Sequence, residues 1–534
     1  MPIATRTCLQ PLAALVVSGL LAGCGGAGGG GGGGGTLGPP ASASGWVAGS
    51  FLPAASFAGK CMSPRGGTDP DTGQPYNEVL GTATDENNWL RSWSNDLYLW
   101  YNEIVDADPG LTATPITYFD GLKTKAIAPS GRDKDRFHFT YPTTQWRQLS
   151  QSGVEAGYGV EWAVAASLPP RRIIVAYTEP GSPATSAQPA LERGEEVQSV
   201  DGTDVVQSNM QADVDRFVAG LYPGNTGELH TFTLRQPRTG VVRTVQLQSV
   251  AVTKTPVRYS TVSTGTGTVG YMLFNDHIAP AEQQLVTAFD AMRTAHVSDL
   301  VIDLRYNGGG LLAIASQVAY MVAGAAATAG QTFEKYTFND KHSGINPVTG
   351  GALTPVPFFS TTLGFSTAGG APLPTLDLRR VYVLTGASTC SASESIINSL
   401  RGINVDVIQI GSTTCGKPYG FYPQDHCGTT YFTVEFKGVN AMSFGDYTDG
   451  FSPNNTPVVG GTRGPGCSVA DDFSYALGDP NEARFAAALA HRNTLACPTA
   501  TGNKPGPLSV FPRQETDAVV PKSLWLQNRW LDLR

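Results

Sequence analysis

The sequence lacks the features by which metal-binding, nucleic-acid-binding and coiled-coil proteins are usually recognised. It has no C-x-x-C pair and only 7 His in 534 residues, which leaves a zinc site with little support. Charged residues make up 15% and the net charge is -8, so a basic surface for nucleic acid is not expected. The many glycines and prolines argue against a long coiled coil. We therefore expect a loop-rich globular protein without metal, cofactor or nucleic-acid partner.

Long hydrophobic runs are also scarce. The first residues contain one apolar stretch of about a dozen residues, too short to span a bilayer and typical of a secretory signal. The tetrad Leu21-Ala22-Gly23-Cys24 resembles the bacterial lipobox, in which the cysteine is acylated, and the glycine run behind it predicts a flexible tether. We expect a signal peptide over 1–23, and a lipidated Cys24 with its tether over 24–59. Gly25, where an Asp would favour the inner membrane, indicates the outer membrane, facing the periplasm; an ordinary signal peptide is the alternative.

Cysteine usage agrees with export. Besides Cys8 and Cys24 the chain has six cysteines, an even number, and disulfides are common in exported proteins. Spacing leaves the pairing open. Cys415 with Cys427 is the preferred pair because it would close a short loop.

The length predicts several domains, since 534 residues exceed what one hydrophobic core serves. A small helical N-terminal domain is expected over residues 60–148. Its main helix has Thr84 as a candidate N-cap. Aromatic and aliphatic residues recur on one face at steps of four, four, three and four, and we interpret them as core: Trp89, Trp93, Leu97, Trp100 and Ile104.

A β domain is expected over residues 150–252. Its loop Gly157-Tyr158-Gly159-Val160 resembles the glycine-aromatic-glycine-aliphatic loop of PDZ domains, and the later "PGSPA" and "LERGEEVQSVDGTDV" look like PDZ sequence too. In that family the loop's N–H groups hold a peptide's terminal carboxylate while the peptide adds as a strand. The resemblance implies partners with free C-termini.

Three buried strands are each followed by a loop of chemical interest. The strands are Leu300–Leu304 before "RYNGGG", Val381–Leu384 before "TGASTCSASE", and Val405–Ile410 before "GSTTCGKPYG". Strand, helix, strand predicts parallel pairing, and such loops leave from one edge of the sheet. We therefore expect Ser391, Lys417 and residues 308–310 to converge there.

Ser391 admits two interpretations. With Glu394 it matches the S-x-x-E capping box, so it could simply cap its helix. A hydroxyl at a helix N-terminus also lies where partial positive charge stabilises an oxyanion. A serine needs a base to take its proton, and a neutral lysine can do so whereas arginine stays protonated.

Three segments, "CSASESI", "DLRYNGGG" and "TTCGKPYG", resemble the signature segments of the C-terminal processing (tail-specific) serine peptidases. With the PDZ-like block, the resemblance covers about residues 85 to 490. It implies a multidomain α/β protein whose catalytic domain, over 256–500, has a crotonase/ClpP-like fold, followed by a tail over 501–534. By position, Ser391 is the nucleophile and Lys417 the general base. The N–H groups of Gly309 and Ala392 would form the oxyanion hole.

The sequence departs from the family at one position. Many relatives have a glutamine four residues after the lysine, where this chain has Phe421; Gln424 is the candidate orienting residue. Two alternatives remain open: a Ser-His peptidase that uses His277, and a non-catalytic peptide-binding scaffold of the same fold. Asp471 and Asp472 are interpreted as solvated rather than as a metal pair. The segment from about 324 to 378 is expected to form a lid or a partner surface.

Overall fold

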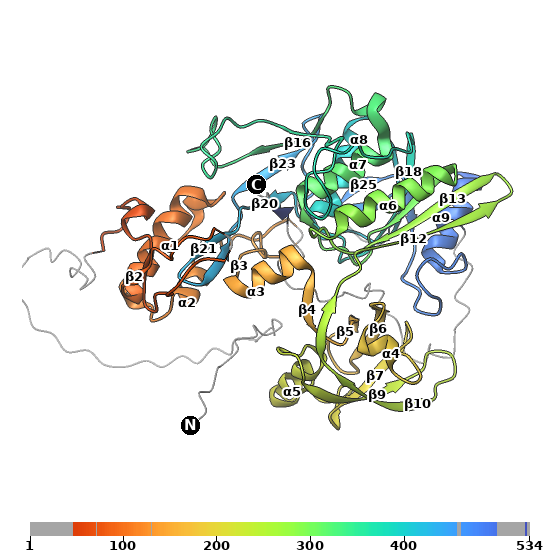
Figure 1. Cartoon of the computed structure of the whole chain (residues 1–534), viewed down its shortest axis with the longest axis horizontal. Coiled ribbons are helices and arrows are strands. Elements are labelled where there is room, and N and C mark those ends of the chain that lie inside the picture. The colour runs from red at the N-terminus through yellow and green to blue at the C-terminus, as the bar shows by residue number, and fades with distance from the viewer. Residues whose placement is uncertain (1–45, 71, 130, 457–460, 499–528, 531–534) are drawn as a thin grey trace, which may run out of the picture.

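The computed structural model describes residues 46–70, 72–129, 131–456, 461–498 and 529–530. The signal peptide, Cys24 and most of the tether lie outside these residues. Figure 1 shows an N-terminal part around α1 and α2, a β-rich part around β5 to β10, and a larger α/β part. Within the described residues, no helix combines the length and the apolar character needed to cross a membrane.

The N-cap of helix α1 (Ala83–Leu97) is Thr82, not the predicted Thr84. The Thr82 hydroxyl accepts the N–H of Asp85 at 3.2 Å, and the Asp85 carboxylate accepts the N–H of Thr82 at 2.9 Å. This reciprocal capping box satisfies two of the amides that a helix start leaves without partners. The prediction of Thr84 was wrong because the box closes two residues earlier.

The same helix ends at Leu97, so the predicted stripe is shorter than expected. Leu99 donates its N–H to the carbonyl of Val434 at 2.7 Å, which draws the chain out of the helical path. Trp100 and Ile104 consequently flank a separate 3-10 turn, η2 (Tyr101–Glu103). Trp89 and Trp93 do form the expected core, stacked with ring centroids 5.3 Å apart.

The N-terminal part is not purely helical, because it also contributes a strand to the α/β part. Strand β3 (Phe139–Pro142) pairs antiparallel with β22 (Thr429–Phe432), which pairs with β21 (Gln424–His426). The three strands lie between the two parts in Figure 1. The other elements of this part are η1 (Ala54–Ser56), β1 (Lys60–Cys61), β2 (Val79–Leu80), η3 (Pro109–Leu111), α2 (Pro115–Asp120), α3 (Thr143–Arg147) and the π-helical turn η4 (Gln148–Ser152).

The β-rich part is an antiparallel sheet in the order β10-β9-β7-β6-β5, so β5 lies at an edge. Its own core contains Trp162, Val175, Phe217 and Phe232. Two further strands, β4 and β11, pair with each other where the chain enters and leaves this part. The bounds are β4 (Val154–Gly157), β5 (Val160–Ala166), β6 (Arg172–Thr178), α4 (Pro183–Ser186), β7 (Glu196–Val200), β8 (Thr203–Asp204), α5 (Gln211–Leu221), β9 (Leu229–Arg235), β10 (Val242–Gln248) and β11 (Val250–Thr253).

The α/β part is built on a sheet in the order β12-β13-β14-β18-β19-β26, in which all pairs after β12-β13 are parallel. The predicted parallel arrangement of the three buried strands is thus confirmed. The bounds are β12 (Val257–Thr264), β13 (Gly267–Phe274), α6 (Ala281–Thr294), β14 (Val297–Asp303), α7 (Leu312–Thr328), β18 (Arg380–Thr385), α8 (Ala392–Gly402), β19 (Asp406–Gly411), β26 (Gly466–Ser468) and α9 (Ala483–Thr494).

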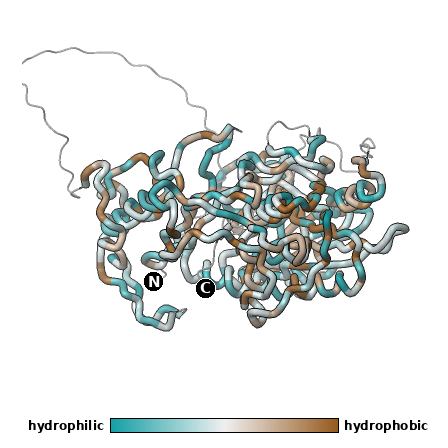
Figure 2. The backbone as a smooth tube through the Cα atoms, turned by 90° about the horizontal axis from the view of Figure 1, so that it is seen from above, coloured by the Kyte–Doolittle hydropathy of each residue, from teal (hydrophilic) through white to brown (hydrophobic). Residues whose placement is uncertain are grey.

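Both faces of this sheet are covered. Val381 and Val383 of β18 pack in the cluster that includes α6, α7 and α8, whereas Tyr382 and Leu384 pack in the cluster that includes α9. Alternate residues of one strand thus enter different cores, which is why the strand is continuously apolar. Figure 2 shows apolar stretches running through the middle of this larger part.

Short strands surround the carboxyl edge of the sheet. They are β15 (Gly310–Leu311), β16 (Thr332–Thr337), β17 (Val356–Pro357), β20 (Tyr419–Gly420), β23 (Phe436–Val439), β24 (Phe451–Pro453), β25 (Thr462–Gly464) and β27 (Arg529–Trp530). The segment 324–378 begins inside α7 and includes β16, which pairs with β23. Its role as a lid or partner surface stays a prediction.

The disulfides differ from the preferred pairing. The structure has Cys61–Cys427, Cys390–Cys415 and Cys467–Cys497, with Cα atoms 5.4, 5.1 and 5.4 Å apart. The pair Cys415–Cys427 is therefore wrong. Strand β21 carries Cys427 to the N-terminal part, while Cys415 lies at the end of β19 beside the turn that follows β18.

Candidate active site

Ser391 lies in the turn between β18 and α8 with an unusual backbone, φ 58° and ψ -113°. A positive φ is costly for a residue with a Cβ, about 1–3 kcal/mol in sparsely populated regions, and such strain clusters at functional sites. The side chain is fully buried. Glu394 accepts the Ser391 N–H as in a capping box, but the Ser391 hydroxyl itself has no hydrogen-bond partner among the described residues.

Glu394 joins the serine loop to the lysine loop. Its Oε2 accepts the N–H of Ser391 at 2.9 Å and the N–H of Lys417 at 2.8 Å. Its Oε1 accepts the N–H of Gly416 at 2.8 Å and the hydroxyl of Thr414. Burial raises the pKa of this carboxyl, and these donors partly offset the rise. One buried side chain thus fixes the spacing between two loops that follow neighbouring strands.

Lys417 is fully buried in an aromatic setting. Its Nζ lies 4.5 Å from the ring centroid of Phe137 and 5.1 Å from that of Phe421. Phe421, four residues after the lysine, therefore contacts the lysine nitrogen through its ring face. Gln424 donates instead to the backbone oxygen of Asp425 at 3.4 Å, and among the described residues its contacts do not include Lys417.

The glycine turn after β14 is organised by Asn307. The Asn307 carbonyl accepts the N–H of Cys390 and the hydroxyl of Ser393, both at 3.1 Å. Its side-chain Oδ1 accepts the N–H of Gly309 at 3.0 Å and lies 3.0 Å from Nδ1 of His277. Asn307 thereby connects the turn to the start of α8 on one side and to His277 on the other.

The predicted oxyanion donors are in different situations. Gly309 has φ 112°, a conformation that favours glycine, and its N–H is engaged by Asn307 in this structure. Ala392 is the first residue of α8, where amides point out of the helix start. The two residues lie at the same edge of the sheet as predicted, but in this state the Gly309 N–H is taken.

A buried charge network anchors the segment "DLRY" before this turn. Arg305 donates to Asp303 at 2.9 Å, to Glu482 at 2.8 Å and to Asp471 at 2.7 Å. Asp471 is also paired with Arg193 of the β-rich part at 2.8 Å, and the two guanidinium groups hold the pKa of Asp471 well below its usual range. The expectation that Asp471 is solvated was wrong, because arginines from distant segments surround it.

The loop Gly157 to Val160 leads into the edge strand β5. The Tyr158 side chain is buried and donates to the carbonyl of Gly220 at 2.9 Å. Gly159 has φ 72°, and a Cβ there would lie 2.2 Å from the Cβ of Ser182, so only glycine fits. The ring of Tyr158 therefore belongs to the core rather than to an open pocket wall.

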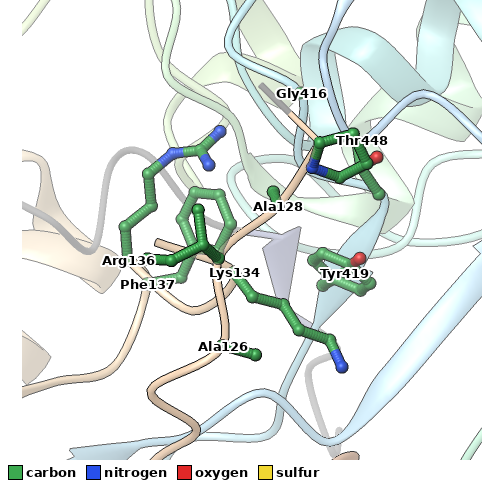
Figure 3. Close-up of a pocket in the computed structure, with 10 residues that line it drawn as sticks. Ala126, Ala128, Lys134, Arg136, Phe137, Gly416, Tyr419 and Thr448 are labelled. Atoms are coloured by element: carbon green, nitrogen blue, oxygen red, sulfur yellow. The ribbon is translucent and has the colours of Figure 1, made fainter. Parts of the chain in front are cut away.

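A cavity of about 280 Å³ opens beside the lysine loop. Figure 3 shows Lys134, Arg136 and Phe137 on the N-terminal side and Gly416 and Tyr419 on the other side. Arg136 donates to the carbonyl of Cys415 at 2.6 Å, and Lys134 forms an ion pair with Glu103 at 2.6 Å. Two parts of the chain thus form the wall next to Lys417.

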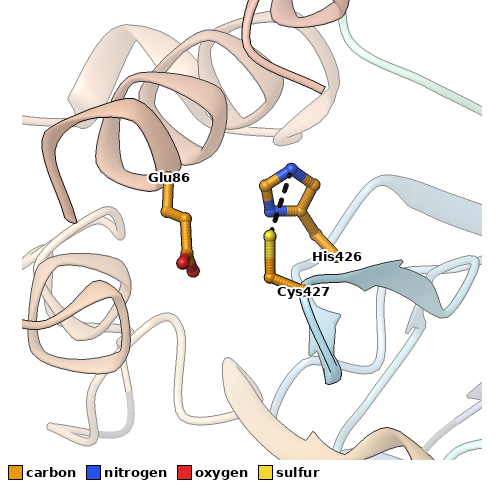
Figure 4. Close-up of side chains that lie close together, drawn as sticks. All are labelled: Glu86, His426 and Cys427. Carbon is orange, nitrogen blue, oxygen red and sulfur yellow. Dashed lines mark hydrogen bonds between the residues drawn. The ribbon is translucent and has the colours of Figure 1, made fainter. Parts of the chain in front are cut away.

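Glu86, His426 and Cys427 also lie close together (Figure 4). Glu86 accepts the N–H of Met62, His426 accepts the N–H of Gly59, and Cys427 is bonded to Cys61. Burial lowers the pKa of His426 to about 4, so the ring is neutral, and it stacks on Trp89 at 4.0 Å. Through these contacts, the three side chains hold the N-terminal part to the α/β part.

Comparison with known proteins identifies the α/β part. Residues 268–423 match the model of peptidase family S41. This chain carries a peptidase family S41 domain. The glycine turn, Ser391 and Lys417 all lie within the matched residues.

Two curated relatives and one solved structure resemble the chain. A carboxyl-terminal-processing protease from Picosynechococcus is 28% identical over 276 residues, which are 51% of this chain and 57% of that protein. Carboxyl-terminal-processing peptidase 1 of Arabidopsis thaliana is 30% identical over 23% of this chain and 24% of its own length. The chain therefore matches less than two thirds of either relative. A putative S41 protease from Bacteroides fragilis has the same fold, with a TM-score of 0.57 and 22% identity over 76% of this chain and 97% of that one.

Several residues of the candidate site were not predicted from the sequence. Glu394 was considered only as a cap, although its carboxylate also binds the lysine loop. Asn307 lies within the segment "DLRYNGGG". An Asn before a glycine turn often accepts a hydrogen bond from a backbone N–H two residues later, and this pattern could have indicated its role. Phe137 carried no signal, since only the tertiary fold brings it to Lys417.

Proposed function

We propose that the protein is a serine endopeptidase in which Ser391 is the nucleophile and Lys417 the general base. The observation that carries the proposal is the strained, fully buried Ser391, whose hydroxyl is unpaired among the described residues and whose amide shares the Glu394 carboxylate with Lys417. The match of residues 268–423 to peptidase family S41 supports the proposal.

The chemistry follows from these groups. The Ser391 hydroxyl passes its proton to neutral Lys417 while its oxygen bonds to the scissile carbonyl carbon. The C–N bond then breaks, the lysine returns the proton to the leaving amine, and water hydrolyses the ester to a carboxylic acid and free serine. The Ala392 N–H stabilises the oxyanion. Gly309 joins it once its N–H leaves Asn307.

The test is cleavage of an unfolded protein by Ser391→Ala and Lys417→Ala. Both variants should lose at least about a thousandfold in kcat, because each removes a group that acts in the transition state. Ser399→Ala, on the same helix with a buried hydroxyl that has no hydrogen-bond partner among the described residues, and Lys437→Ala on β23 are controls that should retain activity. If either site variant cleaved like the wild type, the Ser-Lys assignment would fail.

The two alternatives make different predictions. A Ser-His peptidase requires His277, whose Nδ1 faces Asn307, so His277→Ala would abolish activity while Lys417→Ala would not. A scaffold without catalysis would bind peptides and cleave none. Phe421, in place of the glutamine that many relatives of the resembled family have, is the sequence feature that supports the scaffold.

The finer features extend the same proposal. The β-rich part is a PDZ-like domain that binds substrate C-termini at Gly157, Tyr158, Gly159 and Val160, since the loop precedes an open edge strand to which a peptide can add. The α/β part has a crotonase/ClpP-like fold. The protein is exported and anchored through Cys24 to the outer membrane, facing the periplasm.

A further inference from the structure

A distant segment of the chain lies beside the glycine turn. Strand β27 (Arg529–Trp530) pairs parallel with β15, with Arg529 opposite Gly310 and Trp530 opposite Leu311. Gly310 follows Gly309 directly. β27 thus lies alongside β15, the strand that follows the glycine turn proposed to bind the oxyanion.

The same strand also lies against the lysine loop. β20 (Tyr419–Gly420) begins two residues after Lys417 and neighbours β27, which Figure 1 shows as a dark blue arrow beside it. β27 therefore lies beside the strand that follows the glycine turn and beside the strand that follows the lysine loop. An extended backbone added to an exposed strand is a general mode by which peptides are bound.

The exposure of the site agrees with an occupied cleft. The side chains of Ser391 and Lys417 and the strand residue Leu311 are all fully buried. A nucleophile that acts on other proteins must be reached by a substrate backbone. In this structure, β27 is an extended backbone that lies beside both β15 and β20.

We propose that the segment containing Arg529–Trp530 is an intramolecular occupant of the substrate position and competes with external substrates. This inference rests on the proposed function. Because the segment belongs to the same chain, its effective concentration is set by the connecting chain and not by the concentration of enzyme. The apparent KM rises by the reciprocal of the fraction of open sites, while kcat at saturation stays the same.

The experiment compares the full chain with a variant that lacks residues 527–534 and with one in which the same residues are replaced by Gly and Ser. A fluorogenic peptide substrate reports kcat and KM. Both variants should show a KM at least about fivefold lower, which corresponds to a site open for about a fifth of the time, and a kcat within about twofold. The synthetic peptide QNRWLDLR, the sequence of residues 527–534, should inhibit the shortened enzyme competitively, and a scrambled peptide should not.

Other results would overturn the inference. An unchanged KM in both variants, or a lower kcat that the added peptide does not alter, means that β27 only supports the fold. Ser391→Ala in the shortened enzyme separates the two proposals, since residual cleavage by this variant refutes the dyad and not the occupant. If no form cleaves the substrate, the same peptides are titrated by fluorescence anisotropy against the Ser391→Ala variant with and without residues 527–534. Equal affinity of the peptide QNRWLDLR for the two forms refutes the inference.

Discussion

The disulfide Cys390–Cys415 joins the residue before Ser391 to the residue two before Lys417, with Cα atoms 5.1 Å apart. We predict that the double variant Cys390→Ala/Cys415→Ala loses activity beyond its loss of stability. The bond fixes the backbones of both proposed catalytic loops, and displacement of a reacting group by about 1 Å can cost about a hundredfold in rate. The hydrogen bonds of Glu394 to both loops remain, so some alignment survives. We therefore expect kcat to fall about 10- to 100-fold.

The chain provides a matched control in Cys467–Cys497. In the loop-entropy model a separation of 25 residues at Cys390–Cys415 contributes about 3.5 kcal/mol, and a separation of 30 residues at Cys467–Cys497 contributes about 3.6 kcal/mol. The two double-alanine variants should thus be destabilised to a similar extent. The control bond joins β26 to the segment after α9, away from both loops, so its removal should leave kcat within about twofold.

The assay is kcat on one peptide substrate well below the unfolding temperature, together with urea unfolding of each variant. Similar midpoints with a rate loss confined to Cys390→Ala/Cys415→Ala support the reasoning. Equal rate losses in both variants, or full activity without Cys390–Cys415, would refute it, because the bond would then act only on the unfolded chain.

Three further predictions follow from the structure. Lys417→Arg should be inactive, and wild-type kcat/KM should rise with pH as the base loses its proton; a pH–rate profile with full activity in the arginine variant contradicts this. Burial lowers the pKa of His138 and His426 to about 4, below the unfolded value of about 6.5. Their stabilising effect is therefore present above about pH 6.5 and is lost as the pH falls toward 4, so thermal unfolding measured between pH 7.5 and 4.5 should show a decrease in stability. Gly159→Ala should destabilise the β-rich part by about 2 kcal/mol or more, because the new Cβ would clash with Ser182 and the backbone has a positive φ. In the control Gly202→Ala the new Cβ meets open space, so only the backbone strain of the positive φ remains.

The sequence predicted the sheet and the place of the site because both depend on local patterns. Buried parallel strands are continuous apolar runs, and their loops must leave from one edge, so Ser391, Lys417 and the glycine turn could be placed without coordinates. The end of α1 could not be placed in this way, since a hydrogen bond from Leu99 to Val434 decides it.

The remaining errors have the same physical origin. Cys427 pairs with Cys61 across a separation of 366 residues, and Asp471 is buried by Arg193 and Arg305, which belong to other parts of the chain. Phe137 reaches Lys417 in the same way. Each of these contacts joins segments whose spacing in the sequence bears no relation to their distance in the fold.

The N-terminal part has a consequence for when the proposed active site is completed during folding. Phe137 and Arg136 are made early during synthesis, whereas Cys415, Lys417 and the strands β21 and β22 come hundreds of residues later. Contacts of such high sequence separation form late, because the loop between them must close first. A chain whose synthesis has not yet reached the lysine loop cannot assemble the wall around Lys417. The surroundings of Lys417 are therefore completed only when segments that lie far apart in the sequence have met, so the proposed dyad is assembled late in folding.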